Sequence, residues 1–389
     1  MLSKGEAYFN WWLACLYLSN FSFSIPYKWD ARSESVVLIG PRSRRIYNVT
    51  LFLHSTYFVI MATHLAMNYG SMELPELLKG LVTLLASGFM GISRTTFFFW
   101  EKDFLLLFNG FLNFEKVFLK RFTNIDPSVR KRSLFRCVVF FFGTFTCATF
   151  GLVVAFLLWV RPCTPPYLGS MTSICLSGKE PVAKTWFEYG IKIATVSFEG
   201  MMWFHMGPPC CFAIGNAFQS FSLCLKKYLM ILSNEVRKTP SNKDDQLLSI
   251  FAQYSQLQLL VKQMNITFQD FFTPVGLSVC SNALIFALYV CIRLHDVIPM
   301  PGFVFFPMIL GDAMLIIGVD FASAGPVYLT SKEVSSQWKM LAGKSQAKRK
   351  ARSFCPLKVR FGMNFIDELT SLTILDFSVG QTVSLLVMS

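Results

Sequence analysis

The stretch FVFFPMILGDAMLIIGVDFASA, residues 303–324, decides the fold of this chain. Asp312 and Asp320 are its only charged residues, and nearly all the others are apolar. A helix of this length rises about 33 Å at 1.5 Å per residue, which matches the ~30 Å hydrocarbon core of a bilayer. The stretch therefore predicts a helix that crosses a membrane.

Six further windows have the same character, and together they define the fold class. They lie at about residues 49–68, 78–99, 137–159, 187–212, 270–292 and 364–388. Of the 389 residues 53% are hydrophobic and only 15% are charged, which is more apolar surface than one soluble core needs. The alternating pattern of transmembrane strands is absent. We therefore predict an all-α, polytopic membrane protein with seven transmembrane helices.

The basic residues alternate between the connecting segments, and this alternation predicts the orientation. Four segments hold 29 of the 36 Lys and Arg residues: 1–47, 100–136, 218–263 and 326–363. Because cytoplasmic loops carry the excess of Lys and Arg, we expect the N-terminus in the cytoplasm and the C-terminus outside. The formal charge of +13 forms no single stripe, so no nucleic-acid binding is expected.

Residues 7–27 form an apolar, aromatic stretch that also carries Asn10, Asn20 and Pro26. Basic residues follow it and hold that flank inside. We interpret it as a re-entrant or interfacial helix, with an eighth span as the alternative. The chain then divides into a cytoplasmic N-terminal segment (1–47), helices 1–6 with a ligand pocket and cytoplasmic helical extensions (48–325), a basic cytoplasmic loop (326–363) and the last helix (364–389).

Polar residues inside the predicted spans mark a candidate ligand pocket in the outer half of the bundle. Glu199 lies at membrane depth beside Phe198 and has no partner near it in the sequence. It either lines a pocket or is a satisfied core carboxylate. Thr83, Ser87 and Thr144 would add polar groups to an aromatic-lined cavity of the kind that small ligands occupy. The alternative is that these hydroxyls serve helix packing alone.

Cys163 and Cys175 share the second outer loop, which faces an oxidising space in this topology. They either form a disulfide or remain two free thiols. The sequence shows no phosphate-binding loop, HExxH or GxSxG signature, so we expect no enzyme activity. The other cysteines are scattered without the spacing of metal ligands, so neither a metal site nor a cofactor is expected.

The last span, NFIDELTSLTILDFSVGQTVSLLVMS at residues 364–389, mixes polar with apolar residues. At 100° per residue, one narrow arc of the helix contains Ser378, Gln381, Thr382 and Leu385. Such an arc suits a wet pore with a hydrophobic constriction. It equally suits hydrogen bonds to a neighbouring helix of the same subunit. Because one helix cannot enclose a pore, the first interpretation requires several copies around an axis.

The run CPLKVRFGMNFIDELTSLTILDFSVGQTVSLL, residues 355–386, resembles the end of an arthropod gustatory receptor, within the superfamily shared with insect odorant receptors. The last helix of that family carries Thr-Tyr, five apolar residues and then Gln-Phe. Gln381 falls on the Gln, whereas Ile374, Leu375 and Thr382 occupy the other three positions. The layout of seven spans, a cytosolic N-terminus and a long inner loop before the last span is also similar.

The resemblance implies a ligand-gated, non-selective cation channel in the plasma membrane, assembled as a homo- or heterotetramer of related subunits. Gln381 would line the central pore by its place in the motif, and Ser378, Thr382 and Leu385 by the helical arc. A small-molecule tastant or odorant would bind in the outer half of each subunit. One rival is a G-protein-coupled receptor, which has the opposite orientation. The other is a secondary transporter, which should show inverted repeats.

Overall fold

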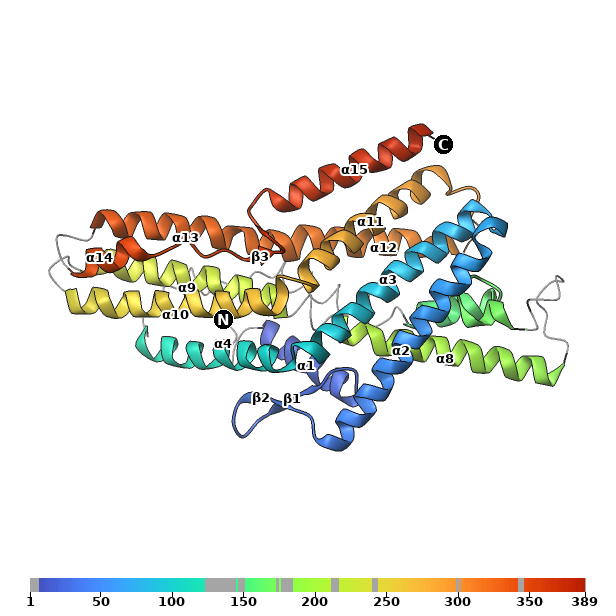
Figure 1. Ribbon diagram of the computed structural model, residues 1–389, viewed down its shortest axis with the longest axis horizontal. Helices are drawn as coiled ribbons and strands as arrows, with labels where there is room; N and C mark the ends of the chain where they lie inside the picture. The colour runs from blue at the N-terminus through green and yellow to red at the C-terminus, as the bar shows by residue number, and fades with distance from the viewer. Residues whose placement is uncertain are drawn as a thin grey trace.

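The structure is a computed structural model, and it describes residues 7–122, 145, 151–172, 175, 185–210, 217–239, 244–298, 300, 302–341 and 346–388. These residues are predominantly helical, and the molecule is elongated (Figure 1). The helices are α1 (Ala7–Phe21), α2 (Pro41–Asn68), α3 (Leu74–Phe99), α4 (Glu101–Arg121), α8 (Trp186–Cys210), α9 (Gln219–Lys238), α10 (Asp244–Phe268), α11 (Phe272–Arg293), α12 (Phe305–Leu315), α13 (Ala322–Leu341), α14 (Gln346–Ser353) and α15 (Thr370–Met388).

Five helical segments among the described residues are long and apolar enough to cross a membrane. They are Pro41–Ser71, Leu74–Phe99, Phe272–Arg293, Gly302–Met340 and Thr370–Met388. Each coincides with a predicted window, which confirms an all-helical membrane fold. α8 covers residues 187–210 of the window at 187–212, carries Glu188, Lys192 and Glu199, and is not among these five segments. The window at 137–159 lies mostly outside the described residues. The count of seven spans and the sides of the two termini stay predictions.

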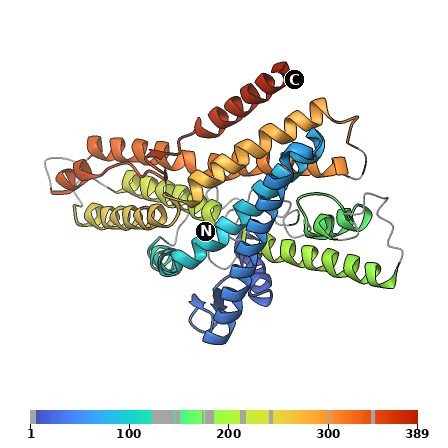
Figure 2. The same ribbon diagram turned by 45° about the vertical axis from the view of Figure 1, so that its right-hand side comes forward.

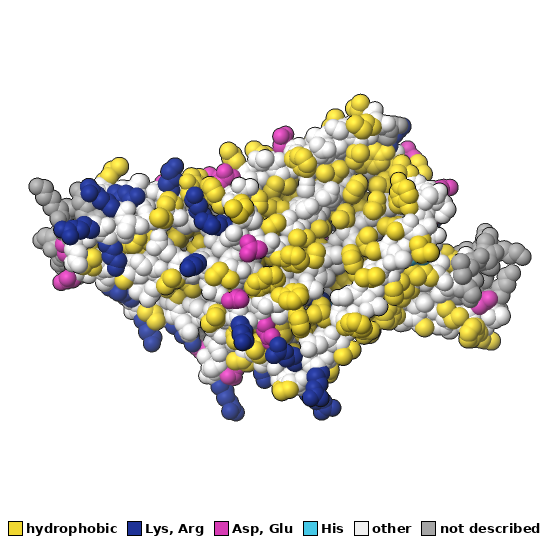
Figure 3. All heavy atoms as spheres, in the orientation of Figure 1, with side chains coloured by type: hydrophobic (Ala, Val, Ile, Leu, Met, Phe, Trp, Pro, Cys, Tyr) yellow, Lys and Arg dark blue, Asp and Glu magenta, His cyan; other side chains and the backbone are white. Residues whose placement is uncertain are grey.

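α4, α9, α10, α13 and α14 pack together at one end of the molecule, here called the basic-end bundle (Figure 1). Its core is aromatic: the ring centroid of Trp338 lies 5.0 Å from that of Phe251 and 5.2 Å from that of Tyr254. In Figure 3, Lys and Arg side chains gather over this end and along the lower edge near the hairpin of β1 (Tyr27–Asp30) and β2 (Ser35–Leu38), whereas hydrophobic side chains are frequent over the middle and right of the face. This distribution is expected if the basic-end bundle projects into the cytoplasm and the remainder lies in lipid.

The N-terminal segment consists of α1 and a hairpin of β1 (Tyr27–Asp30) and β2 (Ser35–Leu38). The 15 residues of α1 rise only about 22 Å, which is shorter than the ~30 Å hydrocarbon core. Trp12 is buried, with its ring centroid 6.1 Å from Trp29 of β1 and 5.2 Å from Phe108 of α4. The interpretation as a re-entrant or interfacial helix, with an eighth span as the alternative, stays a prediction.

α15 begins at Thr370, later than the predicted start at residue 364. A hairpin of β3 (Arg360–Phe361) and β4 (Asn364–Phe365) occupies the preceding residues. Asp367 caps the helix, because its Oδ1 accepts hydrogen bonds from the Leu369 N–H at 3.1 Å and from the Thr370 hydroxyl at 2.6 Å. The Asp367 side chain thus supplies hydrogen bonds that replace those of a further helical turn. This is why α15 begins at Thr370 and not at residue 364.

Gly325 of α13 lies directly against this turn. A Cβ atom at Gly325 would lie 2.5 Å from the carbonyl oxygen of Asp367 and 2.8 Å from the nitrogen of Glu368. Only glycine therefore allows α13 to approach the backbone of the turn this closely. The contact fixes the place at which the chain enters α15.

We predict that Gly325→Ala destabilises the purified protein by about 1–3 kcal/mol, because the added methyl group has no room beside Asp367. Gly311→Ala in α12 is the matched control, since a Cβ atom there would meet nothing within 4 Å. Both substitutions improve helix propensity alike. Equal melting temperatures of the two variants in the same detergent would contradict the prediction.

Candidate functional site

Glu199 of α8 is fully buried, with 0% of its surface exposed. Its carboxylate accepts a hydrogen bond from the hydroxyl of Tyr57 on α2 and another, at 2.7 Å, from the backbone N–H of Leu168. The Phe198 ring packs against Tyr57, with centroids 6.1 Å apart. Two donors satisfy the carboxylate, and these hydrogen bonds connect α8 to α2 and to the loop that contains Leu168. This geometry is that of the satisfied core carboxylate.

The segment 161–172, here called the Tyr167 loop, folds into the end of the helical bundle. Tyr167 is only 5% exposed, and its hydroxyl lies 3.4 Å from Thr83 Oγ1 on α3. Burial raises the pKa of the Tyr167 phenol above its ordinary value, so the hydroxyl stays protonated at neutral pH. A disulfide joins Cys163 to Cys175, whose Cα atoms lie 5.4 Å apart. A covalent bond therefore closes the outer loop on itself, and Tyr167 provides its contact with α3.

The structure brings four of the five predicted ligand-pocket residues to the region around this loop. Phe198 and Glu199 lie on α8, and Thr83 of α3 contacts Tyr167 directly. Ser87, one turn further along α3, directs its hydroxyl toward Met206 Sδ on α8, 3.9 Å away. Thr144 lies outside the described residues. Sequence reasoning missed Tyr167, because nothing in a loop tyrosine signals that it is buried.

Two cavities lie between α3 and α12. The first, here called the Lys79 cavity, measures about 40 Å³, and its lining includes Lys79, Thr83, Leu157, Leu158, Arg161, Thr164, Tyr167 and Phe305. The second, here called the Met90 cavity, measures about 80 Å³, and its lining includes Ala86, Met90, Cys280, Ala283, Ile309, Asp312 and Ala313. Of the predicted pocket residues that the structure describes, Thr83 alone lines either of these two cavities. The cations Lys79 and Arg161 were not among the predicted residues.

The polar residues of α15 divide between two sides of the helix. Ser378 and Thr382 are buried, and Ser378 Oγ lies 2.8 Å from Ser281 Oγ on α11. Gln381 and Leu385 are exposed. The predicted arc is therefore not one pore-facing stripe in this structure, because its buried part holds α15 against α11. Pore lining stays a prediction for the exposed pair, whereas Ser378 and Thr382 face their own subunit.

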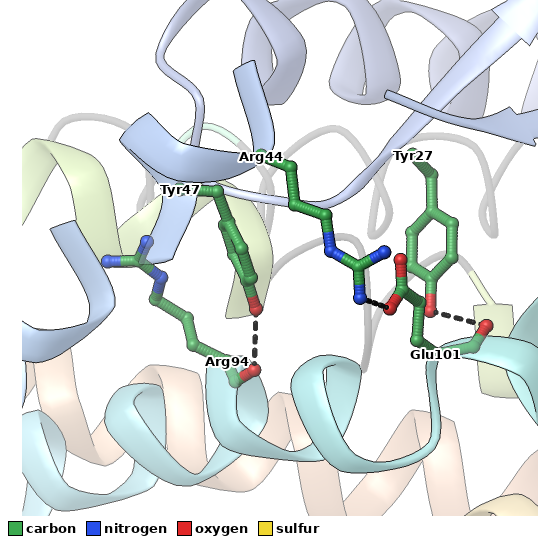
Figure 4. A network of polar contacts seen from close by, with 5 residues as sticks. All are labelled: Tyr27, Arg44, Tyr47, Arg94 and Glu101. Carbon is green, nitrogen blue, oxygen red and sulfur yellow. Dashed lines mark hydrogen bonds and ion pairs between the residues drawn. The ribbon is translucent and has the colours of Figure 1, made fainter. Parts of the chain in front are cut away.

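A second polar network joins the β1–β2 hairpin to the adjoining ends of α2, α3 and α4 (Figure 4). Arg44 forms an ion pair with Glu101 at 2.5 Å, and Tyr27 donates a hydrogen bond to the carbonyl oxygen of Glu101 at 3.1 Å. Tyr47 donates a hydrogen bond to the carbonyl oxygen of Arg94 at 3.0 Å. The network fixes the junction of α3 and α4 beside the start of α2.

The guanidinium of Arg94 is a buried cation inside a candidate span. It contacts the ring of His54 and donates a hydrogen bond to Thr50 Oγ1 at 2.8 Å. Its Cζ atom lies 5.4 Å from the centroid of the Tyr47 ring, at the range of a cation–π contact. These contacts replace part of the hydration that burial removes, and they join α3 to α2.

We predict that Tyr57→Phe destabilises the purified protein by about 1–3 kcal/mol, because the buried Glu199 carboxylate then loses one of two donors. Tyr69→Phe is the control, since Tyr69 lies just beyond the same helix and is 65% exposed. Thermal unfolding in detergent measures both. If Tyr57→Phe unfolds at the temperature of the control, the bond to Glu199 contributes nothing to stability.

No protein-family model and no curated protein sequence gives a significant match to this chain. Solved structures do match. The insect olfactory receptor OR5 from Machilis hrabei in complex with eugenol has a TM-score of 0.64 and 13% sequence identity, over 98% of this chain and 98% of that chain. A second structure of OR5 has a TM-score of 0.60 and 12% identity, with the same coverage. This chain has the fold of an insect olfactory receptor along nearly its whole length.

Proposed function

We propose that this chain is a chemosensory receptor of the insect odorant and gustatory receptor superfamily, and that it is itself a ligand-gated, non-selective cation channel. The fold shared with OR5 over 98% of the chain is the observation that carries the proposal. The resemblance of residues 355–386 to the end of a gustatory receptor supports it independently and favours the gustatory type. Such a receptor would act in the plasma membrane and respond to a small-molecule tastant or odorant.

The pore is assigned to α15. Among the five candidate spans it has the smallest buried share, 17% of its most apolar window. In a lone subunit the exposed Gln381 would present its amide to lipid, which is costly. Several copies of α15 around an axis, in a homo- or heterotetramer, would remove this cost. The Gln381 amides would then replace part of an ion's hydration shell, and Leu385 would form a hydrophobic ring.

The ligand site is assigned to the Tyr167 loop and the cavities between α3 and α12. α11 lies between α3 and α15 in both views of the fold (Figures 1 and 2). It lines the Met90 cavity with Cys280 and Ala283, and it contacts α15 through Ser281. A ligand that binds one position of α11 more tightly than another would shift the population toward the open pore.

We predict that an epitope tag at the C-terminus is reached by antibody in intact cells, whereas a tag at the N-terminus is reached only after permeabilisation. The excess of basic residues in the cytoplasmic segments is the physical reason. Accessibility of the N-terminal tag alone would favour the G-protein-coupled receptor instead. A transporter is distinguished by the next experiment, because it needs no shared pore.

We predict that Gln381→Glu shifts the reversal potential of the ligand-evoked current, under a salt gradient, toward that of a purely cation-permeable pore, since a ring of carboxylates attracts cations and repels anions. Whole-cell recordings with unequal salt concentrations on the two sides of the membrane measure the shift. Asp376→Asn is the control: it also changes the charge of α15 by one unit, but it lies about 140° around the helix from Gln381. Identical reversal potentials for the wild type and Gln381→Glu would remove Gln381 from the pore.

A further inference from the structure

We propose that the Lys79 cavity binds the carboxylate group of a small organic acid, with the apolar tail of the acid lying along α3 and α12. The inference rests on the proposed function, because it names the ligand class of the chemosensory site. It comes from one juxtaposition: Lys79 of α3 and Arg161 of the Tyr167 loop, far apart in the sequence, line the same cavity. Two cations at one small opening are a binding site for an anion.

Within the part of the chain that the structure describes, the two cations have no anionic partner, and neither Lys79 nor Arg161 takes part in an ion pair. Glu76, one turn before Lys79, is exposed and attracts the ammonium only from a distance, while the positive charge of Arg161 repels it. Lys79 is also half-buried, so water hydrates its ammonium incompletely. A bound anion would relieve both the repulsion and the lost hydration.

The other polar groups and the volume of the cavity favour a carboxylate. Thr83, Thr164 and Tyr167 place hydroxyl-bearing side chains on its wall. A carboxylate accepts several hydrogen bonds at once and pairs with an arginine through two parallel bonds. The volume of about 40 Å³ leaves room for about three water-sized groups, which is the size of one carboxylate. A bulky anionic headgroup would not fit inside.

Apolar side chains beside the cations favour an acid with an apolar tail over an inorganic anion. Leu157, Leu158 and Phe305 complete the wall of the Lys79 cavity. One turn deeper on the same two helices, Ala86 and Ile309 line the Met90 cavity, whose lining is apolar apart from Asp312 and a thiol. One turn is about 5.4 Å, which a chain of a few methylene groups covers. The expected class is therefore the short-chain monocarboxylates, for which hexanoate is the probe.

The test measures binding of radiolabelled hexanoate to the purified full-length chain in nanodiscs of zwitterionic lipid. Unlabelled hexanoate, 1-hexanol and hexylamine serve as competitors of equal length with negative, neutral and positive head groups. The variants are Lys79→Gln with Arg161→Gln, and Arg293→Gln as the matched control. Arg293 is an exposed cation at the end of α11 and does not line the Lys79 cavity.

We expect hexanoate to compete at least tenfold better than 1-hexanol or hexylamine, and the double variant to bind hexanoate about tenfold or more weakly. Arg293→Gln should bind as the wild type does. A Lys79→Glu, Arg161→Glu variant distinguishes loss of the two cations from misfolding. It should bind hexylamine in preference to hexanoate, whereas a misfolded protein would bind neither. Equal competition by 1-hexanol, or wild-type affinity in the Lys79→Gln, Arg161→Gln variant, would overturn the proposal.

Binding is measured without a current, so the two proposals fail separately. Hexanoate binding that depends on Lys79 and Arg161, without any hexanoate-evoked current, supports the carboxylate site and counts against the channel. Currents evoked by other small molecules, without hexanoate binding to the wild type, support the channel and overturn the carboxylate site.

Discussion

A polar group inside a bilayer must find its partner within the protein, and the arrangement of this structure depends on that constraint. Glu199 of α8 takes its two donors from α2 and the Tyr167 loop. The Arg94 guanidinium of α3 contacts His54 and Thr50 of α2. Apolar side chains alone would not determine which helices pack together, because contact with lipid tails is as favourable for them as contact with another apolar helix. The costly residues are therefore also the ones that decide which helices lie side by side.

The same constraint shapes the outer loop and, through it, the candidate ligand site. Because Glu199 accepts the N–H of Leu168, the Tyr167 loop is drawn into the end of the bundle. Tyr167 then becomes part of the wall of the Lys79 cavity, and the bond between Cys163 and Cys175 closes the outer loop on itself. A carboxylate buried for structural reasons thus positions Arg161, which begins the loop, beside a second cation of α3.

The sequence predicts well the features that depend on local composition, such as the apolar spans. It predicts poorly which neighbouring element a given side of a helix faces. Apolar windows located all five candidate spans, since length and hydropathy suffice for that. The helical arc correctly placed Ser378 and Thr382 on one side of α15, but the angular spacing of residues does not say which neighbour that side contacts. Here Ser281 of α11 decides the direction. The capping by Asp367 is local, through Leu369 and Thr370, but a window of apolar residues does not detect it. The meeting of Lys79 and Arg161 at one cavity brings together distant segments, which a single sequence does not reveal.

One turn of α11 connects the two parts of the proposed mechanism, which are ligand binding beside α3 and pore opening at α15. Cys280 and Ala283 line the Met90 cavity, while Ser281, between them in the sequence, bonds to Ser378 of α15. Helix backbones are stiff, so α11 cannot yield to a ligand on one side without moving the serine on the other. In the proposed mechanism the Ser378 hydroxyl, which the sequence suggested for ion contact, would instead transmit the position of α11 to α15, the helix that carries the exposed Gln381.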